Sequence, residues 1–454
     1  MSQACIHDAS PPPGAPVRRA SLESLASHRT VLLLQGPNGP FFARLARWLR
    51  QHGCRVFKVN FNAGDACFYR GGGVTAFREH PDRWPQFLRA LTEANAVEAI
   101  AMFGQWRPHH RSAIELAESL DLPFYVFEEG YVRPWWITFE RGEVNAGSSL
   151  RNVDPASLPD EAPPTRPAAI RFGFLRMAWW SAVYFACGLL FARRYPHYRH
   201  HKPFRWMEAL FWSRALVRKI RYVFSERRLR ASLLDPYGPD FFLVPLQLSG
   251  DAQLVFSSHW QGNKDFLSAV ILSFARHSAR SDHLVVKHHP MERGHTDYRQ
   301  EIARLAEAAG VASRVHYLHD GHVPSLLKRS KGAVLVNSTV GIQALYHNVP
   351  VFVCGDAFYA RRGLVASGTQ DAFWSEPQMP ARRAFVNYYR YILRTTQINQ
   401  SFYAGGGFPA TESTAARAAA RSAASVRQAG ADEPAGRSLS DPAGAIIAKR
   451  RSWP

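Results

Sequence analysis

The stretch 284–290 has residue types that could bind an anion at the end of a strand. Its first three residues are aliphatic, and Lys287, His288 and His289 follow. Pro290 ends the predicted strand because proline has no N–H for the ladder. Side chains alternate along a strand, so we expect Lys287 and His289 to share one side. Ligands bind beyond the carboxyl ends of strands in open α/β sheets, so the pattern predicts an anion site, whereas the alternative is a pair of ordinary exposed histidines.

Two adjacent acids, Glu128 and Glu129, follow the apolar run 124–127 and precede Gly130. If that run is a strand, the two carboxylates face opposite sides, and at most one of them is aimed into a site beyond the strand end. We favour Glu129, because Gly130 permits the sharp turn that would present it. The alternative is a surface acid that forms an ordinary ion pair with Arg133.

The chain around the acidic pair alternates strands with helices. The elements that we predict in the first half are strands at 31–34, 55–60, 99–103 and 124–127 and helices at 41–51, 84–91 and up to residue 120. This rhythm predicts a parallel sheet covered on both faces, with its strand-end loops along one rim. The polar side chains that we expect to converge there are Gln35, Asn60, Asn62, Arg107, His109, His110, Glu128, Glu129 and Arg133.

The second half repeats the rhythm. Its predicted strands are 241–246, 284–290, 314–317, 333–336 and 350–355, and its helices are 264–277, 298–309, 322–328 and one that starts at 342. The loop 337–341 (Asn-Ser-Thr-Val-Gly) opens the last of these helices, where hydroxyls cap free N–H groups and the same N–H groups can hold a phosphate. Ser and Thr at a helix N-terminus more commonly serve as caps alone, without a bound phosphate. The glycine-containing loop 35–40 lacks GxGxxG and Walker A spacing, so it indicates neither NAD nor ATP.

The middle of the chain predicts contact with a membrane surface. Residues 177–191 carry no charge but are too few to span a bilayer, which needs ~20 residues. From Arg193 to Arg230 the chain has twelve Lys or Arg and two acids, a net charge of +10, interleaved with aromatic residues. An apolar helix with Trp and Tyr beside a polybasic helix fits an interfacial anchor on acidic lipid. Nucleic-acid binding would explain the charges but not the apolar run, and a buried helix between domains is the remaining alternative.

Composition sets the outer limits. The chain has 454 residues, 46% of them hydrophobic, which is too long for one core and predicts two domains. A net charge of +20 indicates an acidic partner. Five cysteines without CxxC spacing indicate no disulfide framework and no structural metal, which fits a reducing, cytoplasmic setting, and no secretion signal is found. We expect disordered ends at 1–29 and 401–454, Rossmann-like domains at 30–165 and 236–400, and a helical insertion at 166–235.

Two α/β halves with facing polar strand ends are typical of GT-B glycosyltransferases, and five motifs add a family resemblance. The chain resembles the KpsS-type capsule polysaccharide synthesis proteins over about residues 30–395, through the motifs at 34–42 (LQGPNGPFF), 59–65 (VNFNAGD), 127–134 (FEEGYVRP), 287–290 (KHHP) and 336–341 (VNSTVG). The resemblance implies a retaining β-Kdo transferase. It would move the first Kdo from CMP-Kdo to phosphatidylglycerol or lysophosphatidylglycerol, as a peripheral protein on the cytoplasmic face of the inner membrane.

The same resemblance implies roles for single residues. Glu129 is the candidate nucleophile with Glu128 as the fallback, and Arg107, His109 or His110 would hold the Kdo carboxylate or assist proton transfer. The 30–165 domain would take the acceptor and the 236–400 domain the CMP-sugar. The residues assigned to donor binding are Lys287, His289, Pro290, Asn337, Ser338, Thr339, Gly341, Gln35 and Gly36. The sequence departs from the family pattern at two positions. Gln105 stands where an acid is expected, and Glu129 stands where related enzymes usually have Asp.

No metal or other cofactor is required in this scheme, because basic groups can counter the phosphate of departing CMP. The expected partners are CMP-Kdo, the lipid acceptor, the acidic membrane surface and other capsule synthesis and export proteins, without nucleic acid. Two other classes stay open. One is a different CMP- or CDP-dependent transferase, and the other is a non-catalytic component of capsule assembly or export.

Overall fold

A computed structural model describes residues 21–164, 167–170, 173–199, 207–404 and 408. Most of the two ends expected to be disordered, 1–29 and 401–454, therefore lies outside the described residues. Within the first of them, helix α1 (Leu22–Ala26) forms, which the sequence analysis missed. Its signal is a capping box in which Ser21 and Ser24 satisfy each other's backbone N–H groups, while Leu22 and Leu25 are buried.

The first sheet has seven strands in the order β12-β6-β5-β4-β1-β2-β3. Five of them are parallel, the four predicted strands and the unpredicted β3, and β6 and β12 add an antiparallel edge that was not predicted either. The strand bounds are β1 Thr30–Leu33, β2 Arg55–Asn60, β3 Val74–Ala76, β4 Ala99–Phe103, β5 Phe124–Glu129, β6 Ile137–Arg141 and β12 Gln397–Ile398.

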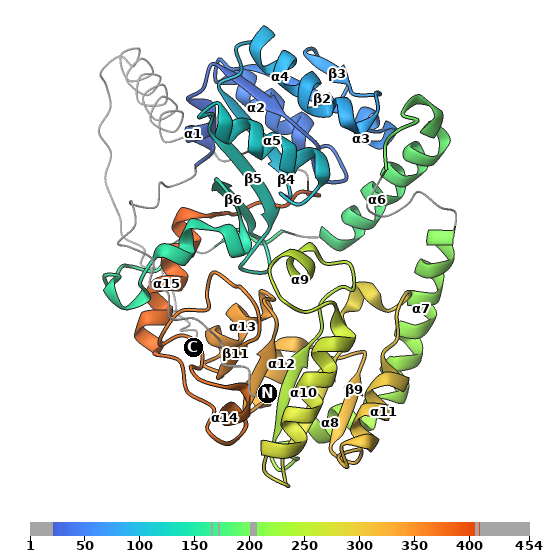
Figure 1. Ribbon diagram of the computed structural model, residues 1–454, viewed down its shortest axis with the longest axis vertical. Helices are drawn as coiled ribbons and strands as arrows, with labels where there is room; N and C mark the ends of the chain where they lie inside the picture. The colour runs from blue at the N-terminus through green and yellow to red at the C-terminus, as the bar shows by residue number, and fades with distance from the viewer. Residues whose placement is uncertain (1–20, 165–166, 171–172, 200–206, 405–407, 409–454) are drawn as a thin grey trace, which may run out of the picture. The chain divides into compact units, whose positions relative to one another are not determined.

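Four helices accompany these strands (Figure 1): α2 Phe41–Gln51, α3 Ala63–Phe68, α4 Trp84–Ala94 and α5 Pro108–Ser119. Helix α2 packs against β2, and α5 packs against β4. Helix α2 buries one apolar face, on which Phe41, Leu45 and Leu49 are fully buried. The helix ends just before Gly53. The φ of Gly53 is +92°, a backbone conformation that costs free energy for any residue with a Cβ.

The second sheet has five parallel strands in the order β11-β10-β7-β8-β9. Their bounds are β7 Phe241–Pro245, β8 His283–Lys287, β9 Val315–Leu318, β10 Gly332–Leu335 and β11 Val351–Val353. The accompanying helices are α9 Ala252–Phe256, α10 Asn263–His277, α11 Arg299–Ala308, α12 Val323–Arg329, α13 Val340–Tyr346, α14 Gln370–Ser375 and α15 Arg382–Thr395. The chain thus has the two α/β sheets that its sequence predicts.

The end of β8 differs from the prediction. The strand stops at Lys287, not at Pro290, because Pro290 begins a 3₁₀ turn (Pro290–Glu292). His289 is the N-cap of that turn, and its Nδ1 accepts a hydrogen bond from the Met291 N–H at 3.2 Å. The alternation of a strand therefore does not apply to His289, and the expectation that it shares a side with Lys287 loses its basis.

Three helices form the insertion between the sheets: α6 Gly173–Leu190, α7 Met207–Ser225 and α8 Arg227–Leu234. Within the described residues, α6 alone is long and apolar enough to cross a membrane, a test that core helices of soluble proteins also pass. It is not a core helix here, because only 11% of its apolar window is buried. The predicted apolar and basic helices are both present.

The chain returns to the first sheet after the second one is complete. Strand β12 pairs antiparallel with β6, so residues 397–398 belong to the first sheet although the sequence analysis placed them in the 236–400 domain. Gln397 secures this return, since its Oε1 accepts the Tyr131 N–H at 3.1 Å and its Nε2 donates to Thr138 Oγ1 at 3.0 Å. A two-residue strand carries no periodicity, so the sequence offered no signal for it.

We predict that Gln397→Ala destabilises the fold by about 1–3 kcal/mol, because the buried Tyr131 N–H keeps only the Thr138 Oγ1 acceptor and the buried Thr138 hydroxyl loses the Gln397 donor. The free energy of unfolding from urea denaturation measures the effect. The exposed Gln86, which bonds only the Arg83 side chain, provides the matched control Gln86→Ala. Equal stability of the two variants would contradict the role given to β12.

Candidate active site

The acidic pair ends strand β5, and both side chains are half-buried. Burial raises the pKa of Glu128 to about 7, against a smaller opposing effect of the Glu129 N–H, which donates to Glu128 Oε1 at 3.0 Å. Burial also raises the pKa of Glu129, while Arg133 lowers it. A carboxyl group with a pKa near 7 exchanges its proton easily at neutral pH, as general acids and bases require.

Charged groups from three other segments surround the pair. Arg107 follows β4, donates to Gly36 O at 3.4 Å and lowers the pKa of Glu128. Asp251 follows β7 of the second sheet and raises that pKa. Tyr403 lies close to both carboxylates, because Glu129 and Glu128 add to the rise that burial gives its phenol pKa. The structure thus brings Glu128, Glu129, Arg107 and Arg133 together, as the sequence predicts.

Beside this group, the loop after β4 of the first sheet contacts helix α9, which follows β7 of the second sheet. The Trp106 ring stacks on Phe256 of α9, with centroids 4.6 Å apart and planes 10° apart. Gln105, the departure from the family pattern, is buried and accepts the Val144 N–H at 2.7 Å. Its side chain therefore supports the fold beside the site.

The two histidines after Arg107 are poor candidates for charge-based roles. His109 lies among aromatic rings that include Phe61 and Trp84, and burial lowers its pKa to about 4. His110 is buried with its Nδ1 2.5 Å from Gly104 O, and burial holds its pKa well below the ordinary value. Neutral imidazoles do not attract a sugar carboxylate, so the structure leaves Arg107 as the better of the predicted groups for that task.

Gln35 takes part in a buried polar network at the ends of β1 and β2. Its Nε2 donates to the hydroxyls of Tyr184 at 2.9 Å and Tyr198 at 2.8 Å. The Tyr184 hydroxyl also lies 2.6 Å from Asn62 Nδ2 and 3.3 Å from Asp65 Oδ1. These contacts hold the insertion against the first sheet. The sequence analysis placed Gln35 in donor binding and missed the tyrosines, which nothing local in the sequence marks.

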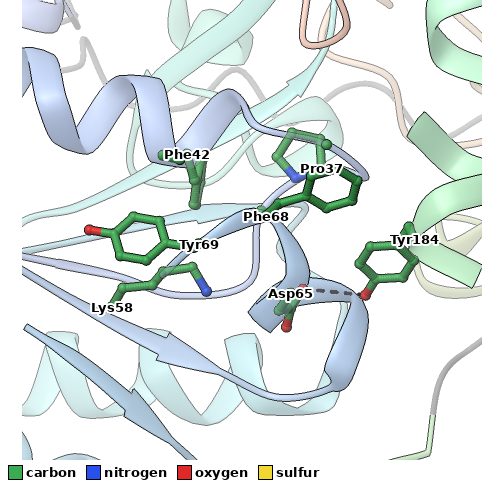
Figure 2. A pocket seen from close by; sticks show the side chains of 10 residues that line it. Pro37, Phe42, Lys58, Asp65, Phe68, Tyr69 and Tyr184 are labelled. Atoms are coloured by element: carbon green, nitrogen blue, oxygen red, sulfur yellow. Dashed lines mark hydrogen bonds between the residues drawn. The ribbon is translucent and has the colours of Figure 1, made fainter. Parts of the chain in front are cut away.

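A pocket opens next to this network (Figure 2). It has an empty volume of about 260 Å³, which includes its open mouth, and Figure 2 shows Lys58 and Asp65 side by side at its wall. Its ten lining residues are Gly36, Pro37, Gly39, Phe42, Ala43, Lys58, Asp65, Phe68, Tyr69 and Tyr184. Gly36 must be small there, because a Cβ would lie 2.9 Å from the Phe42 ring. Gly36 therefore has a packing role, whatever its part in donor binding.

The basic end of β8 is more deeply buried than the sequence suggests. Lys287 is 3% exposed, its Nζ donates to the backbone oxygens of His288 and His319 at 3.0 Å each, and burial lowers its pKa to about 8. His288 Nδ1 lies 2.6 Å from the Tyr317 hydroxyl, and burial lowers the His288 pKa to about 3. Two of the three Lys287 donors thus support the loop, which leaves one for a ligand.

The loop after β10 is held to the loop after β7. Asn337 Oδ1 accepts from Gln247 Nε2 at 2.9 Å, and its Nδ2 donates to the Gln253 and Ser257 carbonyls. Ser338 Oγ accepts the Val340 N–H at 3.3 Å, as a capping hydroxyl does, whereas Thr339 forms no side-chain cap. A Cβ at Gly341 would lie 2.4 Å from the Tyr359 hydroxyl, so glycine is needed there for packing. The donor roles predicted for these residues and for the exposed Pro290 stay predictions.

Among the residues that the structure describes, no group of three His, Cys, Asp or Glu side chains is placed to hold a metal ion. The groups that sequence reasoning missed are Lys58 and Tyr184, which are buried, and Tyr198, which is half-buried. Only Lys58 left a trace, since a lysine in the middle of an apolar strand is unusual.

Comparisons with known proteins point to one family. A family profile described as "Capsule polysaccharide biosynthesis protein" matches residues 98–403. The chain is 38% identical over 392 residues to the capsule polysaccharide export protein KpsS of Escherichia coli, covering 84% of this chain and 99% of that protein. It is 36% identical over 397 residues to the capsule polysaccharide modification protein LipB of Neisseria meningitidis serogroup A, covering 85% and 94%.

Solved structures give a weaker likeness. The β-Kdo 2,7 transferase of Thermosulfurimonas dismutans KpsC matches 79% of this chain and 89% of its own, with 13% identity and a TM-score of 0.38. Anabaena HepE, solved with UDP-glucose, matches 81% and 95%, with 12% identity and a TM-score of 0.34.

The raised pKa of Glu128 predicts a pH dependence of stability. Its folded-state pKa of about 7 exceeds the ordinary 4.5, so the folded protein binds a proton that the unfolded chain releases between these values. Stability relative to Glu128→Gln should therefore fall as pH rises from about 5 to 7, by roughly 2–3 kcal/mol. Urea denaturation at several pH values measures this. The exposed Glu115→Gln is the control, and a pH-independent difference for Glu128→Gln would contradict the burial argument.

Proposed function

Because the chain belongs to the capsule polysaccharide biosynthesis family that includes KpsS and LipB, we propose that it is a glycosyltransferase that starts the lipid linker of a capsule. The proposed reaction moves a Kdo sugar from CMP-Kdo to the hydroxyl of phosphatidylglycerol or lysophosphatidylglycerol, with retention at the anomeric carbon. The observation that carries the proposal is the half-buried pair Glu128 and Glu129 at the carboxyl end of β5, beside Arg107 and Asp251.

The two carboxylates suit a double displacement. One attacks the anomeric carbon as the bond to the CMP phosphate breaks, and CMP departs. The acceptor hydroxyl then attacks the sugar ester, its proton passes to a base, and the carboxylate is released. We assign the nucleophile to Glu129, as the sequence predicts. Glu128 is suited to take the proton, because its pKa of about 7 lies near the pH of the reaction.

The second sheet supplies the basic groups for the nucleotide. Lys287, at the end of β8, has one donor left for a phosphate oxygen. The N–H groups near Ser338 and Thr339 follow β10, which is separated from β8 only by β7. These groups would stabilise CMP as it leaves, so the reaction needs no metal in this scheme. The two-sheet organisation fits a GT-B arrangement with the acceptor on the first sheet.

The insertion supports a place on an acidic membrane surface. Apolar side chains on α6 and α7 are exposed to solvent: Phe174, Leu175, Trp179, Leu189 and Leu190 on α6, and Leu210, Trp212, Leu216, Val217, Ile220, Val223 and Phe224 on α7. The same helix α7 carries Arg214, Lys219 and Arg221. Apolar groups that enter the interface and cations that attract anionic lipid together give peripheral binding on the cytoplasmic face.

One observation favours a different function. The E. coli relative is named an export protein, which fits a non-catalytic component that works with other capsule proteins. Calorimetry with CMP separates this candidate from both the proposed enzyme and another CMP- or CDP-dependent transferase, because an assembly component need not bind the nucleotide. A donor screen then separates the two kinds of enzyme.

We predict that Glu129→Gln lowers transfer at least 100-fold while CMP binding stays nearly unchanged, because the nucleophile is lost without loss of the phosphate contacts. Mass spectrometry of purified protein with CMP-Kdo and phosphatidylglycerol measures the product. Glu128→Gln should also lower turnover and remove the rise of activity with pH near 7. Glu115→Gln, an exposed acid on α5, serves as the control, and unchanged turnover of Glu129→Gln removes that residue from the mechanism.

The membrane proposal needs point variants, because deleting 177–230 would also remove the buried Tyr184 and Glu226. We predict that Val217→Glu with Ile220→Glu weakens binding to vesicles of phosphatidylglycerol and phosphatidylethanolamine at least tenfold, since both side chains are exposed on α7. Vesicle co-sedimentation measures it. Met379→Glu, at an exposed position of the second lobe, is the matched control, and equal binding of all three proteins would end the anchor hypothesis.

A further inference from the structure

The pocket of Figure 2 contains a buried cation that the catalytic scheme does not use. Lys58 lies in β2 and is 3% exposed. Its Nζ donates to the backbone oxygen of Val59 and to Asn60 Oδ1, both neutral acceptors. In the described part of the chain the ammonium forms no salt bridge with a carboxylate. A buried ammonium without a charged partner costs free energy, and an anion entering the pocket would offset that cost.

The nearby carboxylate of Asp65 is engaged elsewhere. It accepts hydrogen bonds from the Phe61 N–H at 3.0 Å, the Tyr184 hydroxyl at 3.3 Å and Asn62 Nδ2 at 3.4 Å. Asp65 therefore faces the pocket as a polar wall, and its field only partly offsets the lowering of the Lys58 pKa by burial. The cation and a set of hydroxyl and carboxylate oxygens thus line one small space, as Figure 2 shows.

The position of the pocket is that of a substrate site in an α/β sheet. Gly36 and Pro37 follow β1, and Asp65, Phe68 and Tyr69 follow β2, so the pocket lies beyond the carboxyl ends of two adjacent parallel strands. Arg44 of α2 and Arg176 of α6 lie close enough for Arg176 to lower the pKa of Arg44, which burial lowers further still. The surroundings therefore carry additional positive charge.

Helix α6 forms one side of the pocket and extends away from it. Tyr184 lines the pocket, the Trp180 ring contacts Phe68 with centroids 5.5 Å apart, and Trp180 packs against Gly39. Beyond these contacts α6 exposes Leu175 and Trp179 to solvent. A narrow pocket with a buried ammonium at its wall, beside an exposed apolar helix, matches a ligand with a small anionic, hydroxyl-bearing head and an apolar chain.

We propose that the Lys58 pocket binds the glycerophosphate headgroup of an anionic lipid whose acyl chains lie along α6. The phosphate pairs with the Lys58 ammonium, and a headgroup hydroxyl donates to the Asp65 carboxylate, which also lines the pocket. This inference rests on the proposed transfer to a lipid and deepens it, because it assigns the acceptor to residues of β2 and α6. A free polyol phosphate shares the headgroup chemistry, so the experiment includes both.

Calorimetry with the full chain tests the assignment. The probes are dihexanoyl phosphatidylglycerol, sn-glycerol 3-phosphate and dihexanoyl phosphatidylcholine, with CMP measured in parallel. Lys58→Met keeps the length of the side chain and removes its charge, and the exposed Lys264→Met is the matched control. We expect Lys58→Met to bind dihexanoyl phosphatidylglycerol at least tenfold more weakly, while Lys264→Met binds it normally and both variants bind CMP as the wild type does.

A second measurement does not depend on the variant folding well. The pKa of Lys58 is about 8, and an anion beside the ammonium raises it, so binding at pH 8.5 should take up a fraction of a proton. Titrations in two buffers of different ionisation enthalpy detect this uptake in the wild type. The proposed site would be contradicted by a lack of proton uptake in the wild type, or by equal binding of dihexanoyl phosphatidylglycerol by wild type and Lys58→Met.

The remaining outcomes separate the sources of the ligand and the two proposals. Tight binding of sn-glycerol 3-phosphate, lost in Lys58→Met, supports the glycerophosphate site but assigns it to a soluble ligand. Equal affinity for phosphatidylcholine and phosphatidylglycerol contradicts selection by the Lys58 charge for an anionic head. If the headgroup binds through Lys58 and no sugar is transferred from CMP-Kdo, the result supports the lipid site and contradicts the proposed enzyme activity.

Discussion

The structure depends on one buried hydroxyl. The phenol of Tyr184 lies within hydrogen-bonding distance of Gln35, Asn62 and Asp65. It therefore joins helix α6, most of which lies outside the core, to the ends of β1 and β2. A buried polar group that loses its partners costs about 1–3 kcal/mol, so this cluster resists separation of α6 from the sheet. Gly64 makes room for it, because a Cβ there would lie 2.7 Å from the Tyr184 ring.

Helix α7 is fixed to the second sheet by the same kind of interaction. The Glu226 carboxylate accepts the N–H groups of His319 and Asp320 and contacts His319 Nδ1 at 2.8 Å, while Tyr222 stacks on the His319 ring. Helices α6 and α7 are therefore held to different sheets through polar residues, and each leaves apolar side chains exposed. The insertion is thus part of both lobes, and a lipid surface that contacts it would lie next to the strand ends of each.

Buried charge at strand ends is the shared feature of the candidate site. Burial moves Lys58 and Lys287 to pKa values of about 8 and Glu128 to about 7, each toward its neutral form. Such groups reduce stability unless a ligand or a neighbour supplies the missing charge, and they gather at sites that bind or react. Lys287 and Glu128 lie at the carboxyl ends of β8 and β5, where α/β sheets bind ligands, and Lys58 lies within β2 at the wall of the pocket.

Periodicity and strand-end position are local properties, so most strands and helices and the convergence of Glu128, Glu129 and Arg107 could be predicted from the sequence, and five motifs indicated the family. The short elements α1, β3, β6 and β12 were not predicted. Only the tertiary structure decided which polar groups are buried and what satisfies them. It assigned Gln35 to a network with Tyr184, gave two Lys287 donors to backbone oxygens, and placed Gln397 in the first sheet. Apart from the bond of Lys287 to the neighbouring His288, these contacts join residues far apart in the chain, and burial, which sets their pKa values and energies, exists only once the chain has packed.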